Sequence, residues 1–528
     1  MQIDKMSIKE SAQPENNSGF IFTVLISYVA LLLTGILLHP MWRDEIHFWS
    51  ISGASSGLGD LLQRKEWDGH PDLWYILVYA VRSLFDNPVA MQLMHSGIAI
   101  TTVFLILKYA PFPKVQRGLL VFGYFFLFEY AMISRNYAIG ILLITLILVL
   151  YPQRTRYIFL IALIMFLLVQ TNMFSIILCM AFLLTWGFEF IFSKTFRTEL
   201  LRKKATVAIS ILLVLAGIVY SLQTVIPPPA PNPSGVMDFS LSQLTLQELI
   251  RSVATVWKAW VPVPELTPQF WNTNMVGSDV IEAILALIML FAAALLFIKR
   301  PVVLFLYTIG MAGIIGFIFI IFYGYLRHHG HLFLLLVICL WLKEFYQEQQ
   351  LDSHPYFPEK IYQWMKRNSA HLVTFLLLIH VLAGMYAFAI QIVTPFSAGK
   401  ETARYIRQEK LDRYLMAGDR DISLETVTSY LDQEAFYFGR KSFSRYLNYN
   451  PNLRHRPDES AIMMMADSLM RVNGDTILLV MNSPLTEARW VNLKRLQSFE
   501  QSIVADEVYY LYLLSPHPQL YKSPEEIK

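Results

Sequence analysis

Residues that could perform acid–base chemistry stand close together in the segment HPMWRDEIHFW, which directly follows an apolar run. Asp44 and Glu45 are adjacent, and His47 stands three residues after the first of them. Adjacent carboxylates can have different roles in catalysis. One can take a proton from a hydroxyl, while its neighbour binds a metal or raises the pKa of the first carboxylate. The alternative is a solvated acidic turn beside the aromatic residues of a membrane interface.

Charged residues also stand at the ends of later apolar runs. Glu129 lies inside FLFEYAM, and an ionisable group at such a position is costly and usually functional. The alternative is a structural ion pair with Arg135. A guanidinium group binds phosphate through two parallel hydrogen bonds, so Arg135 and Arg327 are candidates to hold a phosphate whose charge grows during a transfer reaction.

The histidine-rich segment RHHGH leaves several roles open. His328 and His329 could bind a metal, donate to a phosphate or only pack at the interface, and His70 could simply begin a helix with Pro71. No cofactor is predicted with certainty, and a divalent metal is left open, with Glu45, Glu129 and His328 as candidate ligands. The predicted substrate-binding residues are His47, His70, Asp72, Tyr137 and Asn172.

The composition identifies the broad class of the protein. Of 528 residues, 55% are hydrophobic and only 16% are charged, compared with about 25% charged residues in soluble proteins. Such a chain is an integral membrane protein with several spans. The net charge of +3 gives no indication of nucleic-acid binding. Cys179 and Cys339 lie in apolar runs, so a disulfide is not indicated.

Eleven apolar runs predict about eleven transmembrane helices. They fall at about 20–38, 90–109, 118–133, 138–151, 157–169, 173–192, 205–225, 278–298, 302–324, 332–342 and 372–393.

The charge of the connecting segments predicts the orientation. Basic segments alternate with segments that are poor in lysine, so the basic set, including the tail 1–19, is predicted to be cytoplasmic. The outer set includes a first loop at 39–89 with amphipathic helices and a second loop at 226–277. Residues 70–85 carry Arg82, and their crossing would invert the alternation, so we expect them to lie at the outer interface.

Residues 394–528 differ from the rest of the chain in composition. Charges are frequent, and short apolar runs such as DTILLVMN alternate with helical segments. The pattern predicts a soluble α/β domain. An odd number of spans places this domain on the outer side of the membrane. We expect the membrane to be the inner membrane of a bacterium, and the outer side is then the periplasm.

Three motifs within residues 20–150 are RDEIHFW, GHPDLWYILVY and MISRNYAIG. Together they resemble motifs of the GT-C superfamily of membrane glycosyltransferases. RDEIHFW resembles the DE-x-HF motif of protein O-mannosyltransferases. GHPDLWYILVY resembles the HPPL-type segment of that group and of bacterial polyprenyl-phosphate-dependent transferases, and MISRNYAIG resembles their SR-x-Y segment. Trp49 stands where the mannosyltransferases have glycine, and their Leu-Asp after SR-x-Y is replaced by Ala138 and Ile139. These departures argue against a protein O-mannosyltransferase proper.

The resemblance implies a reaction and roles for individual residues. It implies a GT-C fold and transfer of a sugar from a polyprenyl-phosphate donor at the outer face of the membrane. The first acid of the pair, Asp44, is then the general base, and Arg135 lies near the donor phosphate. Glu45 orients the site or binds a metal, and Glu129 supplies the second acid. One base and a phosphate leaving group predict inversion at the anomeric carbon.

The acceptor is left open among a glycan, a lipid and a protein, and the remaining partners are the sugar donor and the lipid bilayer. A transporter or flippase for a lipid-linked sugar is the competing hypothesis, followed by a non-catalytic binding protein. A transporter would need polar residues throughout the membrane depth, whereas the candidates here gather at one predicted face.

Overall fold

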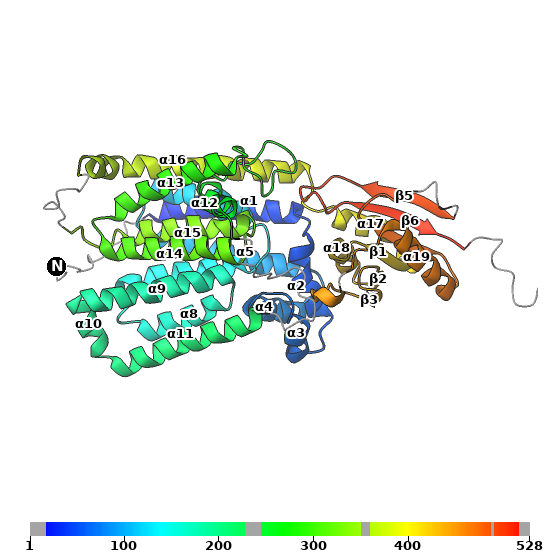
Figure 1. The fold of residues 1–528 in the computed structure, drawn as a ribbon, viewed down its shortest axis with the longest axis horizontal. Helices are drawn as coiled ribbons and strands as arrows, with labels where there is room; N and C mark the ends of the chain where they lie inside the picture. The colour runs from blue at the N-terminus through cyan, green and yellow to red at the C-terminus, as the bar shows by residue number, and fades with distance from the viewer. Residues whose placement is uncertain are drawn as a thin grey trace, which may run out of the picture.

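The computed structural model describes residues 17–226, 244–349, 359–453, 455–486, 490 and 492–516. Most of the predicted tail 1–19, part of the loop 226–277 and part of the basic segment after the tenth apolar run lie outside these residues. The described chain has two parts: a bundle of long helices and a small domain with a β-sheet beyond one end of it (Figure 1).

Seven helices are long and apolar enough to cross a membrane. They are α1 (Ser18–Leu38), α5 (Val89–Tyr109), α9 (Met173–Phe192), α11 (Lys204–Val225), α13 (Asp279–Phe297), α14 (Pro301–Ile320) and α16 (Glu359–Val393). Each coincides with a predicted apolar run. Many of their large apolar side chains are exposed, for example Phe291 and Phe375, as expected where lipid replaces water as the solvent. Helix α16 begins earlier than predicted, inside the basic connecting segment.

Three further predicted spans form shorter apolar helices. These are α7 (Tyr137–Leu150), which continues into the 3-10 turn η2 (Tyr151–Gln153), α8 (Ile158–Val169) and α15 (Leu326–Leu342). The run 118–133 is not one helix: α6 (Lys114–Val121) ends before Gly123, and the π-helix η1 (Tyr124–Glu129) follows. The chain turns at Gly123, which packs against His380 of α16 so closely that an added Cβ would lie 3.1 Å from that side chain. The number of crossings therefore stays a prediction.

Helix α15 corrects the predicted position of the histidine-rich segment. The sequence placed RHHGH after the end of the preceding span, whereas Arg327, His328 and His329 lie in the first turn of α15 itself. The preceding helix α14 ends at Ile320. The apolar run begins only at Leu332, so a hydropathy pattern could not reveal that the helix starts six residues earlier.

Shorter helices fill the connecting segments. The first loop forms α2 (Arg43–Gly53), α3 (Leu58–Arg64) and α4 (Leu73–Arg82), which lie at the end of the bundle nearest the sheet domain (Figure 1). Helix α4 is too short to cross a bilayer and packs on α2 through Phe48, Trp74 and Tyr75. Helix α10 (Lys194–Leu201) joins α9 to α11, and α12 (Leu246–Trp260) lies in the second predicted loop.

The C-terminal part confirms the predicted α/β character. Its elements are α17 (Gly399–Gln408), η4 (Leu411–Arg413), β1 (Leu415–Asp419), α18 (Asp421–Leu431), β2 (Ala435–Tyr437), β3 (Ser442–Ser444), η5 (Pro451–Leu453), α19 (Glu459–Asn473), β4 (Ile477–Met481), β5 (Leu493–Phe499) and β6 (Tyr509–Leu514). The sheet order is β3-β2-β1-β4-β6-β5, in which β1 pairs in parallel with β2 and β4, and the other pairs are antiparallel.

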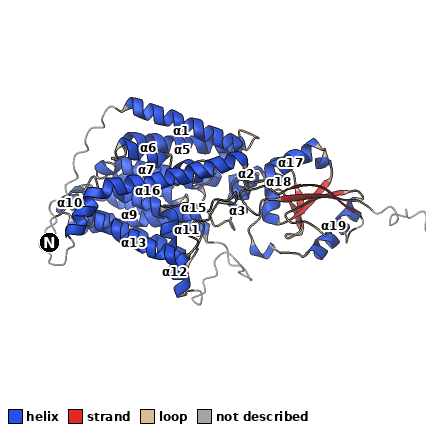
Figure 2. Cartoon of the chain, turned by 90° about the horizontal axis from the view of Figure 1, so that it is seen from above, coloured by secondary structure: helices blue, strands red, loops and turns tan. Residues whose placement is uncertain are grey.

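Both faces of this sheet are covered by helices (Figure 2). Along the buried strand β4, Leu478 and Val480 face α17 and α18, whereas Leu479 and Met481 face α19. Side chains alternate between the two faces of a strand, so the continuous apolar run ILLVM predicts burial on both sides.

Close packing at Gly330 of α15 connects the bundle core to Arg327. A Cβ at this position would overlap Phe125 and the hydroxyl of Tyr130, and that hydroxyl donates to the carbonyl oxygen of Arg327 (2.6 Å). The absence of a side chain at residue 330 thus allows η1 and the first turn of α15 to lie in contact.

We predict that Gly330→Ala destabilises the protein. Forcing a methyl group into a packed interior costs about 1–3 kcal/mol, which should lower the thermal unfolding midpoint in detergent. The control is Gly316→Ala in α14, because an added Cβ there meets no neighbour within 4 Å. Equal midpoints for the two variants would contradict the packing argument.

Candidate active site

A cavity of about 230 Å³ lies where the helices of the first loop meet the end of the bundle. Its wall contains eight of the predicted site residues: Asp44, His47, His70, Arg135, Tyr137, Asn172, Arg327 and His328. Segments that are hundreds of residues apart in the sequence thus meet at one site.

Asp44 is bound by two guanidinium groups. Its Oδ2 atom accepts hydrogen bonds from Arg135 (2.6 Å) and Arg327 (3.1 Å). The first turn of α2 supplies the carboxylate, the segment after η1 supplies one arginine, and the first turn of α15 supplies the other. The arginine side chains are 4% and 8% exposed, while that of Asp44 is 22% exposed, so the acid is the member of the trio most open to the cavity.

These charges determine the ionisation of Asp44. Burial by itself raises the pKa of a carboxyl group, but the charges of Arg135, Arg327 and Arg43 outweigh it and lower the pKa of Asp44 to about 2. The group is therefore a carboxylate at neutral pH, as a proton acceptor must be, although a carboxylate of such low pKa is a weak base.

Glu45 does not lie on the cavity wall. Its Oε1 atom accepts from the backbone N–H of Ser134 (2.6 Å) and its Oε2 atom pairs with Nε2 of His39 (2.8 Å). The side chain is fully buried. The two adjacent acids thus bind two adjacent residues of the MISRNY segment, Glu45 at Ser134 and Asp44 at Arg135, and the geometry gives Glu45 a positioning role.

Glu129 also lies outside the cavity wall. It is buried, and its Oε2 atom accepts from the hydroxyl of Tyr124 and from the indole of Trp271, both at 3.0 Å. Its predicted alternative, an ion pair with Arg135, does not form, since that arginine binds Asp44. Trp271 also contacts Arg327, whose guanidinium carbon lies 5.5 Å from the ring centroid, so Glu129 reaches the site only through an intermediate residue.

His47 uses both ring nitrogens to join the first loop to the α/β domain. Nε2 pairs with Asp68 and Nδ1 with Glu425 of α18, each at 2.8 Å. Burial lowers the pKa of a histidine, but the two carboxylates outweigh it and raise the pKa of His47 well above its ordinary value. His47 is therefore a charged connection between the two parts of the protein.

His70 and Asp72, predicted together, have different environments. Nε2 of His70 accepts from Arg135 (3.3 Å), and burial followed by the charge of Arg135 lowers the pKa of His70 to about 3. The ring is thus neutral. Asp72 does not line the cavity, because its carboxylate pairs with Lys65 (2.6 Å) and accepts from the hydroxyl of Tyr220 (2.6 Å).

The remaining predicted residues divide between two cavities. Tyr137 and His328 line the first cavity, and Nδ1 of His328 accepts from the N–H of Tyr325 (2.8 Å), which leaves Nε2 as the donor nitrogen. Asn172 also lines it while capping α9 through a bond from Ser175. His329 instead lines a second cavity and donates to the carbonyl oxygen of Tyr323 (2.8 Å).

The three candidate metal ligands do not come together. Glu45 binds His39 and Ser134, Glu129 binds Tyr124 and Trp271, and His328 binds the backbone of Tyr325. Within the described parts of the chain, no three His, Cys, Asp or Glu side chains gather into a cluster that could hold a metal ion.

Several wall residues were not predicted from the sequence. Phe48, Phe174 and Phe322 belong to segments near the predicted ones, so loop position was the available signal. Asp68 also lies on the wall, and its place in the same outer loop as His70 and Asp72 made it a candidate from the sequence. Tyr449 is different, because it comes from the α/β domain, and its place in the segment after β3 gave no indication that it lines this cavity.

The architecture consists of an apolar helical bundle, short helices in its first loop and a small C-terminal α/β domain. The predicted fold class is confirmed, and the chain is a multi-pass membrane protein.

The structure is similar to two crystal structures of ArnT from Cupriavidus metallidurans. The TM-score is 0.53 for the apo state and 0.51 for the form bound to undecaprenyl phosphate. In both comparisons the sequence identity is 13%, and the match covers 95% of this chain and 99% of the other. No family model matches the sequence, and no curated protein matches it, so the likeness rests on the fold.

We predict that His47→Gln lowers the stability by up to about 3 kcal/mol at pH 6, because two buried carboxylates lose their cation. The histidine pKa is raised on folding, so its contribution is complete below about pH 6.5 and is lost as the pH rises through the folded-state pKa. The difference between the unfolding midpoints of wild type and variant should therefore shrink as the pH is raised. His455→Gln, an exposed position, is the control, and a pH-independent difference would contradict the charge assignment.

Proposed function

We propose that the protein is a glycosyltransferase that moves a sugar from a polyprenyl-phosphate-linked donor to a hydroxyl group. The reaction occurs at the end of the bundle that faces the α/β domain. This end lies on the outer side of a bacterial inner membrane, with the N-terminus in the cytoplasm and the α/β domain in the periplasm. Asp44 is the general base, and the anomeric configuration is inverted.

One observation carries this proposal: a single carboxylate lies between two arginines on the wall of a cavity at the end of an apolar bundle. The arginines can bind a phosphate through charge-assisted hydrogen bonds, and the carboxylate can accept a proton. A lipid tail among the apolar helices would place its phosphate at this depth. The fold adds support, because it is one that hosts glycosyl transfer.

Donor binding would also activate the base. A phosphate that takes hydrogen bonds from Arg135 and Arg327 competes with Asp44 for them, and the loss of these partners raises the pKa of Asp44 towards that of an effective base. The base is thus weak when the site is empty and becomes stronger once the donor is bound. His70 stays neutral beside Arg135, so it adds no negative charge that would compete with the phosphate for the arginines.

The transfer then proceeds as a single displacement. Asp44 takes the proton of the acceptor hydroxyl, whose oxygen forms a bond to the anomeric carbon while the bond from that carbon to the phosphate oxygen breaks. The departing polyprenyl phosphate gains negative charge, which Arg135 and Arg327 stabilise. His328 can donate from Nε2 to the same phosphate. Glu45 holds Ser134 and thereby keeps Arg135 beside Asp44.

One of the similar ArnT structures contains undecaprenyl phosphate. A polyprenyl phosphate is the leaving group of the reaction proposed here, so that ligand has the chemistry that the two arginines of this chain would bind. The acceptor is proposed only as a hydroxyl group.

We predict that Asp44→Asn lowers the rate of transfer by about 100-fold or more, because the variant has no general base. The assay follows radiolabelled polyprenyl-phosphate hexoses into any product in membranes. The control is Asp60→Asn in α3, since Asp60 is an acid of the same loop that pairs with Arg64 outside the cavity. Turnover retained by the Asp44 variant would exclude it as the base. Donor binding without transfer by the wild type would favour a carrier of lipid-linked sugars.

We predict that Arg135→Gln weakens the binding of undecaprenyl phosphate by about tenfold or more, since a charge-assisted hydrogen bond contributes about 1.5–3 kcal/mol. A binding titration of purified protein in nanodiscs with undecaprenyl phosphate measures this effect. Arg404→Gln is the matched control, because Arg404 lies exposed on α17. Unchanged affinity in the Arg135 variant would remove this residue from the phosphate site.

A further inference from the structure

The α/β domain contacts the bundle through the edge of its sheet where such folds usually bind ligands. Strand β1 has β2 on one side and β4 on the other, so the direction of the strand order reverses at β1. Ligands of open α/β sheets bind at the carboxyl ends of the strands at such a point. Here Asn482, which follows β4, donates from its backbone to Asp419 at the end of β1 (3.0 Å) and from its side chain to the carbonyl oxygen of Asp506 (2.8 Å).

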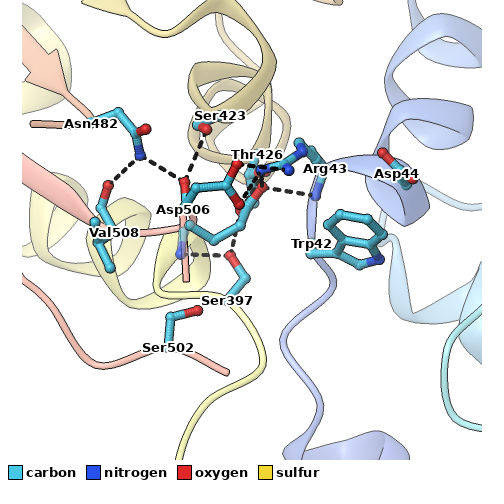
Figure 3. A network of polar contacts seen from close by, with 12 residues as sticks. Trp42, Arg43, Asp44, Ser397, Ser423, Thr426, Asn482, Ser502, Asp506 and Val508 are labelled. Carbon is cyan, nitrogen blue, oxygen red and sulfur yellow. Dashed lines mark hydrogen bonds and ion pairs between the residues drawn. The ribbon is translucent and has the colours of Figure 1, made fainter. Parts of the chain in front are cut away.

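Arg43 of the first loop binds at this edge (Figure 3). Its guanidinium group donates to both carboxylate oxygens of Asp506 (2.9 Å each) and to Oε1 of Glu507 (3.2 Å). Glu507 is fully buried, and its Oε2 atom accepts from Ser397 and Thr426. Figure 3 shows that Arg43 points into this network while Asp44, the next residue, points away from it.

A second connection leads to Tyr449 from α2, the helix that also carries Arg43. Oε1 of Glu425 binds His47 and also accepts from the backbone N–H of Leu447 (2.9 Å). Two residues later, the ring of Tyr449 meets that of His47 edge-on, with centroids 5.2 Å apart. The segment is held further by Tyr446, which is buried in the apolar cluster of the first loop. Tyr449 thereby forms part of the cavity wall together with Asp44.

We propose that the α/β domain completes the candidate active site: the Arg43–Glu507 ion pair positions the domain against α2, and Tyr449 then binds the sugar of the donor. This proposal rests on the proposed function and deepens it by assigning the recognition of the sugar. The phosphate belongs to the arginines of the bundle, and the sugar lies against an aromatic residue of the other domain.

The chemistry of the wall supports this division. A tyrosine combines an apolar ring face with a polar end, which suits a sugar that has both C–H faces and hydroxyl groups. The carboxylates Asp44 and Asp68 lie on the same wall and can accept hydrogen bonds from sugar hydroxyls. The phosphate-binding arginines enter from the bundle, so the two halves of the donor would meet different domains.

The first test compares two ligands of full-length protein in nanodiscs: undecaprenyl phosphate, and the polyprenyl-phosphate hexose that wild type binds best among a panel. Tyr449→Ala should weaken binding of the sugar-bearing lipid about tenfold and leave undecaprenyl phosphate unaffected. Arg135→Gln should weaken both. The control is Tyr414→Phe, which removes a hydroxyl that accepts only a surface bond from Arg413. Equal effects of Tyr449→Ala on both lipids, or no effect on either, would overturn the assignment.

The second test concerns the position of the domain. Glu507→Gln should lower kcat at least tenfold with a smaller change in KM for the donor, whereas Asp467→Asn, in an exposed pair with Arg471, should have no effect. The hydroxyl groups of Ser50 and Ser429 are in contact across the same interface, and both native cysteines are buried. A disulfide between Ser50→Cys and Ser429→Cys should therefore restore turnover to the Glu507 variant.

These outcomes separate the two proposals. Failure of the disulfide to restore turnover, with the disulfide formed, would overturn the positioning role of Glu507. Transfer by the wild type and by the Tyr449 variant at equal rates would overturn the sugar assignment alone. No transfer and no lipid binding by the wild type would overturn the proposed function and this inference with it.

Discussion

The candidate site depends on the binding of one carboxylate by two arginines. Asp44 joins the start of α2 to the segment after η1 and to the first turn of α15. Guanidinium groups as buried as these are stable only with a partner, so the three segments must meet wherever the chain folds correctly. The same arrangement leaves two positive groups beside a cavity, where an anion can replace the carboxylate. The structural ion pair and the proposed phosphate site thus use the same atoms.

Adjacent acids in this motif have separate tasks because successive helical residues point in different directions. Asp44 faces the cavity, while Glu45 binds the backbone of Ser134 and the ring of His39 inside the protein. Arg43, one residue earlier, points towards the α/β domain. Three consecutive charged side chains therefore contact three different parts of the molecule. Any shift of α2 would alter all three contacts together, which makes the helix a rigid reference for the site.

Polar contacts of buried groups join the α/β domain to the bundle, beside apolar contacts made by Ile503, Val504 and Tyr446. Arg43 with Glu507 and His47 with Glu425 are both charge pairs with little exposure to solvent, and an unpaired member of either would be costly. Such contacts specify one orientation, since a hydrogen-bonded charge tolerates little displacement. The orientation matters for the proposed function because it places Tyr449 of the α/β domain on the wall of the cavity.

The sequence by itself determined the membrane class, the seven long helices, the α/β character of the C-terminal part and eight wall residues. These follow from local properties: the hydropathy of a run, the alternation of a strand, and charged residues at the ends of apolar segments. Only the tertiary structure decided that Glu45, Glu129 and Asp72 lie off the wall, that the run 118–133 bends at Gly123, and that Tyr449 lies on the wall. The direction of a side chain depends on the start of its helix and on partners far away in the sequence, and neither is encoded in the local pattern.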